Sequence, residues 1–547
     1  MKNFVYFHCY GEDLWRGYEK NGLLRENFGI RCMQSIYLSE DRLFNSILKK
    51  GGELYNYIKE KKCFLYVDRL QGGTVIQEYE YDEELIREYR EMLGDRFLGF
   101  QMHEWLTNYK NDVDMKLAEL SEEQWTEENI KRMIFEKYPY PYLFLEAMTA
   151  KEHAEAGKPK SWQQFYDNMT AIYRKRAEKF PLLPCSSWFM MFPFEAENGA
   201  TAIMPEIGTQ TRHMRLQMCF ARGVCKAYGI RLGAYYEPWG GIPFGACSYN
   251  NVPQNEWGVE RSEGALCGKG GENYGSSRSL QWRAHLYAYL SGAKFISEEW
   301  GGYNTFKDME TYELSEYGLV KKRFLDFVDK YPDVGEKVSP IAAVISNRLP
   351  CFTVEGYATG GDETMFGYPM DEELMAINKA AKDGARRIFQ DRVDMLGTEP
   401  KVLINSHIPD AVDMLNEGDG HALKAYQYLV DITGEADFKD RYDNVITPDE
   451  VEEKLHELLP CRVDGGFHYL LNEAEDGYYL SVFNHSGIVR TVETGELVLP
   501  EATKTATITI KDGKCLLPLE GNTDVRLENG KYFVNLKGGE WLFAKIL

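Results

Sequence analysis

Short apolar runs alternate with amphipathic segments from the start of the chain to about residue 348, and this alternation constrains the fold most. Several runs are continuously apolar, as strands are when helices cover both faces of a sheet. Strands alternating with helices run parallel, and about eight of them favour a closed (β/α)8 barrel. We predict strands at 4–9, 63–68, 97–102, 184–192, 200–204, 230–235, 294–296 and 341–346, with a possible further strand at 30–37.

The segments between these strands carry helical signals. Apolar side chains recur at intervals of four, three, four and three residues across 214–228, which lines one face of a helix. Ser276 or Ser277 can cap a helix that runs through 280–291, and Ser121 opens another with the pattern of a capping box. These signals support the alternating strand and helix order.

The 547 residues exceed what one compact core holds, so we expect several domains. We assign 1–350 to the barrel and 461–547 to a small all-β sandwich, in which Asp512-Gly513 and Asn529-Gly530 are hairpin turns. Residues 351–460 are either the end of the barrel or a subdomain packed against it. The predicted fold class is therefore α/β, a TIM barrel followed by a β-sandwich.

Charge and composition exclude several functions. The net charge is −22 and no basic cluster occurs, so neither nucleic acid nor an anionic membrane is an expected partner. The 11 cysteines form no C-x-x-C pair, and the histidines show no ligand spacing, so we expect no metal or cofactor. The first residues lack the features of a signal peptide, and we expect a cytoplasmic location unless one was removed. No G-x-S-x-G, H-E-x-x-H or G-x-G-x-x-G motif is present.

Three predicted strands end in an acidic residue with a tryptophan close by: Glu104-Trp105, Glu237-Pro238-Trp239 and Glu299-Trp300. The active site of a (β/α)8 barrel lies at the carboxyl ends of its strands. Paired carboxyl groups cleave glycosidic bonds, and indole rings stack on the apolar face of a sugar. The pattern is typical of a glycoside hydrolase.

The run Phe295 to Gly301 resembles the strand-seven nucleophile segment of the clan-A barrel glycosidases, in which a glutamate precedes Trp-Gly or a similar pair. The resemblance implies that Glu299 is the nucleophile. Glu298 is its rival, because side chains alternate along a strand and only one of the two can point inward.

The segment Tyr236-Glu237-Pro238 is similar to the Asn-Glu-Pro of the acid/base strand in the same superfamily, which implies that Glu237 is the proton donor. Two departures leave the assignment open. Tyr236 replaces the asparagine that contacts the sugar 2-hydroxyl. Only 62 residues separate Glu237 from Glu299, so their strands are predicted neighbours, whereas family members place two further strands between them. Glu104 is the alternative acid.

Further residues at strand ends are candidates for binding substrate. Trp105, Trp239 and Trp300 are the predicted sugar platforms, and segment 242–277, which includes Trp257, is a predicted rim loop. Asp68 and Arg69 either bind hydroxyls or lock the rim by an internal ion pair. The remaining candidates for contacts with the sugar are His103, Tyr236, Glu298 and Glu206.

The sequence thus predicts a glycosidase that hydrolyses a neutral oligosaccharide or glycan, with a retaining mechanism. Glu299 would act as nucleophile and Glu237 or Glu104 as acid/base. Two alternatives remain, an inverting hydrolase on the same barrel and a catalytically silent glycan-binding protein.

Overall fold

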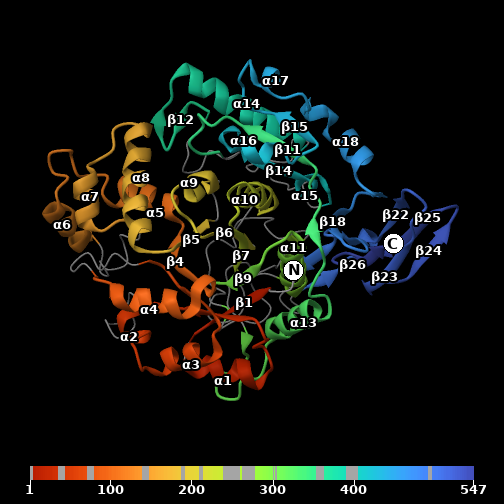
Figure 1. Cartoon of the computed structure of the whole chain (residues 1–547), viewed down its shortest axis with the longest axis horizontal. Helices are drawn as coiled ribbons and strands as arrows, with labels where there is room; N and C mark the ends of the chain where they lie inside the picture. The colour runs from red at the N-terminus through yellow and green to blue at the C-terminus, as the bar shows by residue number, and fades with distance from the viewer. Residues whose placement is uncertain are drawn as a thin grey trace.

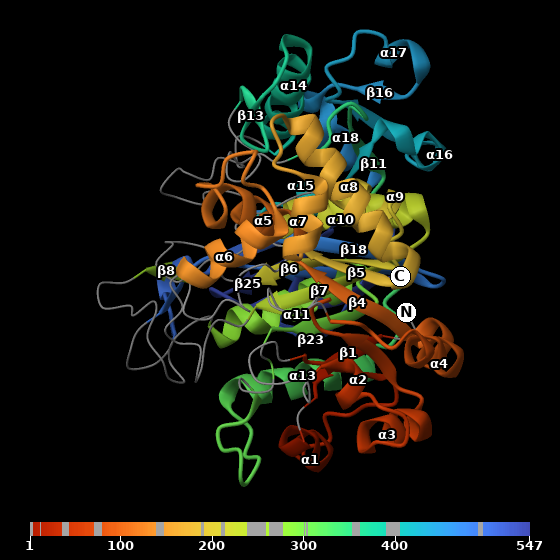
Figure 2. The same ribbon diagram turned by 90° about the vertical axis from the view of Figure 1, so that its left-hand side faces the viewer.

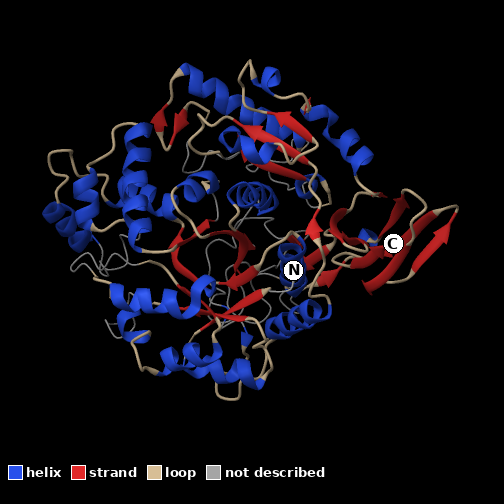
Figure 3. Ribbon diagram, in the orientation of Figure 1, coloured by secondary structure: helices blue, strands red, loops and turns tan. Residues whose placement is uncertain are grey.

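The computed structural model describes residues 4–10, 12–34, 43–70, 79–137, 147–186, 191–208, 214–237, 259–261, 277–299, 301, 305–352, 362–389, 405–490 and 496–547. A closed barrel forms its centre, ringed by helices (Figures 1 and 3). Its strands all pair in parallel, and the last one closes on the first. In order they are β1 (Val5–Cys9), β2 (Phe28–Cys32), β3 (Phe64–Val67), β4 (Phe97–His103), β5 (Leu182–Ser186), β6 (Ala202–Gly208), β7 (Arg231–Glu237) and β9 (Phe295–Glu298).

The predicted barrel is confirmed, but one of the eight predicted strands lies outside it and the possible further strand is part of it. The possible strand at 30–37 is β2, the second strand of the barrel. The predicted strand at 341–346 is β11 (Ile341–Ile345), which belongs to another sheet. β2 is hard to recognise because Gly29 and Arg31 interrupt its short apolar run, whereas β11 is apolar throughout.

Helices pack around the barrel and bury their apolar faces against its outer surface. Ser277 is the cap of α11, since its hydroxyl accepts a hydrogen bond from the Leu280 amide at 2.9 Å. The helix expected from Ser121 begins later, at Glu127, where the hydroxyl of Thr126 accepts from the Asn129 amide. The surrounding helices include α1 (Glu12–Lys20), α3 (Glu53–Lys61), α4 (Glu83–Leu93), α5 (Trp105–Asn111), α6 (Glu127–Lys137), α7 (Ala150–Ala156), α8 (Trp162–Lys179), α10 (Met214–Tyr228), α11 (Arg278–Leu290) and α13 (Glu316–Lys330).

A second parallel sheet lies beside α10, on the side of the molecule away from α1 and α3 (Figures 1 and 2). Its strand order is β14 (Val412–Asn416), β11, β15 (Tyr428–Asp431) and β16 (Val445–Ile446). A β-carbon on Gly223 of α10 would lie 2.1 Å from the carbonyl oxygen of Met414, so glycine permits this close packing. Helices α14 (Glu372–Ile388) and α18 (Val451–Leu458) belong to the same region of the chain.

The chain ends in two antiparallel sheets, which confirms the predicted β-sandwich. One has the order β10 (Glu336–Lys337), β18 (His468–Ala474), β19 (Gly477–Phe483), β26 (Trp541–Ile546) and β23 (Leu516–Gly521). The other has the order β17 (Cys461–Asp464), β22 (Lys504–Ile510), β25 (Lys531–Leu536) and β24 (Val525–Glu528).

The two turns predicted in this sandwich differ. Asn529-Gly530 is the expected hairpin between β24 and β25, and both of its residues have positive φ. Asp512-Gly513 also has positive φ but links β22 to β23, which belong to different sheets. The sequence therefore identifies this turn correctly but does not indicate which strands β22 and β23 pair with. Among the described residues, no helix combines the length and apolarity needed to span a membrane.

Candidate active site

The carboxyl ends of the barrel strands bring together charged side chains from distant parts of the sequence. Arg31 on β2 donates two hydrogen bonds to the Asp68 carboxylate, at 2.9 and 3.0 Å, and also donates to the backbone carbonyl of Glu298. Both side chains of the pair are buried. Of the two roles considered for Asp68, its position fits the internal ion pair, which ties β2, β3 and β9 together.

Arg69 follows Asp68 and faces Glu299. Its guanidinium lies 3.8 Å from a carboxylate oxygen of Glu299, and its backbone is left-handed, with φ of 48°. A residue other than glycine adopts this conformation at a cost, and such strain gathers at functional sites. The Glu299 amide donates to the carbonyl of Tyr236 at 2.9 Å, so the end of β9 is fixed to β7.

Glu299 is 5% exposed, and burial raises the pKa of its carboxyl group to about 7. Arg69 and Arg31 oppose this rise, whereas the negative charges of Glu104 and Asp68 add to it. Glu299 and Glu104 are thus close enough to interact electrostatically, as expected for residues at the carboxyl ends of barrel strands.

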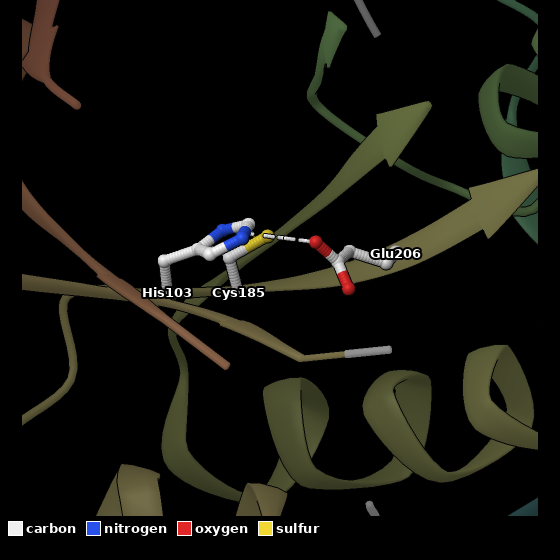
Figure 4. Close-up of side chains that lie close together, drawn as sticks. All are labelled: His103, Cys185 and Glu206. Carbon is white, nitrogen blue, oxygen red and sulfur yellow. Dashed lines mark hydrogen bonds and ion pairs between the residues drawn. The ribbon is translucent and has the colours of Figure 1, made fainter. Parts of the chain in front are cut away.

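Glu104 follows β4 and also has a left-handed backbone, with φ of 44°, where α5 begins. One of its carboxylate oxygens lies 3.7 Å from Nε2 of His103. Nδ1 of the same ring lies 3.7 Å from a carboxylate oxygen of Glu206, and Figure 4 shows these two side chains. Burial, together with Arg69 and Arg31, lowers the pKa of His103 well below its usual value. The ring is therefore neutral at pH 7 and offers one donor and one acceptor.

Glu298 points away from this site. Its carboxylate lies 2.7 Å from Nζ of Lys321 and 3.1 Å from Nε2 of His285, and it accepts from the hydroxyl of Tyr6. Burial raises its pKa, but Lys321 and His285 outweigh burial and lower the pKa to about 2. The predictions of Glu298 as a substrate-binding residue or rival nucleophile are wrong, because strand alternation directs it toward the helices.

Two other candidates, Tyr236 and Trp105, are buried side chains. Tyr236 is 0% exposed and packs against the ring of His285, at 4.9 Å between centroids, so it does not occupy the place of a sugar-binding asparagine. Trp105 is 3% exposed, with the Arg176 guanidinium 4.8 Å above its ring. Trp105 lines a small pocket with Arg69 and His103, but so little of its ring is exposed that it does not offer the flat face of the predicted sugar platform.

Several candidates lie outside the described residues. They are Trp239, Trp300, Trp257 and most of the predicted rim loop 242–277. Glu237 ends β7 and pairs in register with Gly208, but its side chain lies outside the described part of the structure.

The positions of the three glutamates in the strand order differ from those that the family resemblance implies. Glu104 follows the fourth strand of the barrel, Glu237 ends the seventh, and Glu299 follows the eighth. β7 and β9 are neighbours, as the 62-residue separation predicted. The resemblance of the Glu299 segment to strand seven does not hold in the strand order, because β2 belongs to the barrel and β9 is therefore its eighth strand.

Two residues of the site, Arg31 and Cys185, were not among the residues predicted from the sequence. Arg31 was absent from the candidates, although an arginine inside a short apolar strand is itself a signal of a buried charge pair. Cys185, whose thiol donates to Glu206 at 3.5 Å, carries no signal in the sequence.

No protein-family model matches the chain, and no curated protein matches it significantly. Solved structures similar to it include Gan42B, a GH42 β-galactosidase from G. stearothermophilus, with 8% identity and a TM-score of 0.46 over 100% of this chain and 98% of that one. The α-L-fucosidase isoenzyme 2 from Paenibacillus thiaminolyticus has 9% identity and a TM-score of 0.43 over 100% and 99% of the two chains. These are similarities of overall architecture at very low identity, and the fold described here rests on the strand pairing.

The raised pKa of Glu299 predicts a pH-dependent difference in stability. A carboxyl whose pKa rises from 4.5 to about 7 on folding stabilises the protein most below pH 4.5 and loses that contribution as pH rises to 7. The glutamine of Glu299→Gln stays neutral at every pH. We therefore expect the variant's free energy of unfolding, relative to that of the parent, to rise by up to about 3 kcal/mol from pH 5 to pH 8. Urea denaturation of both proteins at the two pH values measures this. Equal pH dependence would contradict the titration.

Proposed function

We propose that the protein is a glycoside hydrolase that cleaves a neutral oligosaccharide or glycan at the mouth of its barrel with retention of configuration. The observation that carries the proposal is the convergence of Glu104, Glu206 and Glu299, from three different strand ends, around His103 and Arg69, with Glu206 and Glu299 buried and Glu104 partly exposed. Carboxyl groups in such a group take different protonation states, as acid-base cleavage of a glycosidic bond requires.

The strand positions favour one pair of carboxyl groups for the chemistry. In the clan-A glycosidases that the sequence resembles, two strands separate the acid/base strand from the nucleophile on strand seven. Glu104 and Glu237 meet this spacing, with β5 and β6 between their strands, and Glu299 on the eighth strand does not. Glu237 is accordingly the proposed nucleophile, and Glu104 is the proposed acid/base.

The reaction then has two steps. Protonated Glu104 gives its proton to the glycosidic oxygen while the carboxylate of Glu237 attacks the anomeric carbon, and the leaving group departs as an alcohol. Glu104, now a carboxylate, removes a proton from water, and the water oxygen displaces Glu237 from the sugar. Two displacements restore the original anomeric configuration.

The other residues of the site tune Glu104. Glu299 interacts electrostatically with Glu104, and when Glu299 is ionised its charge favours the protonated form of Glu104. Arg69 faces Glu299 and limits this effect. His103 is neutral, and its Nε2, which lies 3.7 Å from Glu104, can bind a substrate hydroxyl beside that carboxyl group.

The first test is the configuration of the released sugar. Incubation with a panel of nitrophenyl glycosides identifies a cleaved sugar, and proton NMR at early times shows the anomer that is formed first. We expect the same anomer as in the substrate. Release of the opposite anomer would replace the retaining mechanism by the inverting one, in which the same glutamates activate water directly. Binding to a glycan without turnover of any substrate would instead identify a silent glycan-binding protein.

A further inference from the structure

Three side chains form a compact cluster at the carboxyl ends of consecutive strands. The reaction proposed above does not use the three together. His103 ends β4, Cys185 lies near the end of β5, and Glu206 lies on β6 (Figure 4). His103 and Cys185 are partners in the strand register, so they stand side by side. Cys185 and Glu206 are 0% exposed, and the His103 side chain is 7% exposed.

The spacing of the potential ligand atoms fits a tetrahedral metal ion. One ligand atom from each residue lies within 4.8 Å of the others. The Glu206 carboxylate oxygen is 3.5 Å from Sγ of Cys185 and 3.7 Å from Nδ1 of His103. In a tetrahedral zinc site, bonds of about 2.0–2.3 Å separate neighbouring ligand atoms by about 3.3–3.6 Å, so the cluster needs little rearrangement.

The charges around the cluster leave room for a cation. The two nearby guanidinium groups are already engaged with carboxylates, Arg31 with Asp68 and Arg69 with Glu299. Nδ1 of His103 makes no hydrogen bond within the described structure. Nδ1 of His103 is thus a buried polar atom without a hydrogen bond that faces a carboxylate, and a metal ion between the two would bind both.

We propose that His103, Cys185 and Glu206 bind one Zn²⁺ ion, with a water molecule as the fourth ligand. Imidazole, thiolate and carboxylate together are a donor set that zinc accepts, whereas Mg²⁺ and Ca²⁺ prefer oxygen ligands alone. In this structure the Cys185 thiol donates a hydrogen bond to Glu206. Zinc binding would release that thiol proton, because the ligand is the thiolate. The ion joins the ends of β4, β5 and β6 and so fixes the backbone that leads into Glu104.

Metal content of the purified full-length chain tests the proposal directly and does not depend on hydrolase activity. The protein, prepared without metal-affinity resin, is exposed to zinc chloride, dialysed to remove free metal and analysed by plasma mass spectrometry. We expect about one zinc per chain in the parent protein and a loss of at least tenfold in Cys185→Ser and Glu206→Gln. Cys219→Ser is the matched control, because Cys219 is also buried but bonds to a backbone carbonyl within α10, and it should keep the parent's zinc.

A cobalt titration identifies the ligand. Co²⁺ bound by a thiolate absorbs in the near ultraviolet through sulfur-to-metal charge transfer, so the band should appear in the parent and in Cys219→Ser but not in Cys185→Ser. A parent protein that retains no more zinc than Cys185→Ser, and shows no such band with Co²⁺, overturns the site. The parent's own zinc content, well below one per chain, and the absence of the Co²⁺ band from the parent are sufficient for this outcome even if a variant fails to fold.

Discussion

Glu237→Gln should reduce turnover by several orders of magnitude while glycan binding persists, because the amide occupies the same volume but cannot form the covalent intermediate. The loss should be the same for substrates with good and poor leaving groups, since every substrate needs the nucleophile. The measurement is kcat for a nitrophenyl glycoside and for the matching oligosaccharide, with binding followed by calorimetry. Glu528→Gln, which alters an exposed glutamate on β24 of the C-terminal sandwich, is the control and should behave as the parent.

Glu104→Gln completes this test because a proton donor affects the two substrates unequally. A nitrophenolate leaves without protonation, so formation of the glycosyl-enzyme should be nearly unchanged for it, whereas cleavage of the oligosaccharide should fall by about 10²–10⁴-fold. Added azide should restore turnover of the nitrophenyl substrate, since azide attacks the intermediate without needing a base. If Glu299→Gln instead lost turnover equally on both substrates, as we expect for Glu237→Gln, then Glu299 would be the nucleophile. That result would contradict the assignment from strand order.

The sequence was sufficient for the architecture but not for the strand count on which the roles depend. Continuous apolar runs such as β11 are the easiest strands to recognise, yet β11 lies outside the barrel. β2 carries Arg31 in its interior because that side chain pairs with Asp68 of the next strand, and the pairing is invisible to a local pattern. The short motifs around Glu237 and Glu299 did not indicate their strand positions, which are the seventh and the eighth in the barrel.

The composition of the site was only partly predictable for a related reason. The side chains that surround Glu104 are selected by strand register and helix packing. His103 meets Cys185 across the β4–β5 pair, and Trp105, one residue beyond Glu104, turns into the core because α5 begins there. Of the neighbouring pair Glu298 and Glu299, alternation indicates that only one faces the site, and the helices that hold Lys321 and His285 decide which.

Glu298→Gln should destabilise the protein by about 3–5 kcal/mol, because it leaves the ammonium group of Lys321 buried without its carboxylate partner. Lys321 is 2% exposed and Glu298 1% exposed, so water cannot replace the lost charge. The pKa of Glu298 is lowered from 4.5 to about 2, which means that its contribution is present above pH 4.5 and is lost as pH falls toward 2. Urea denaturation at pH 7 measures the change, and the difference between parent and variant should shrink as the pH is lowered through this window.

Two further variants separate the buried charge from the general effect of a substitution. Asp383→Asn breaks an exposed ion pair with Lys379 on α14 and should change stability little. The double variant Glu298→Gln with Lys321→Met removes both charges, and an apolar side chain in place of the ammonium should recover much of the loss. A double variant no more stable than Glu298→Gln would mean that the hydrogen bonds from Tyr6 and His285, rather than the charge of Lys321, account for the stability of this cluster. In either case the readout is stability, so the result bears on how the end of β9 is anchored beneath Glu299 and not on which glutamate performs the chemistry.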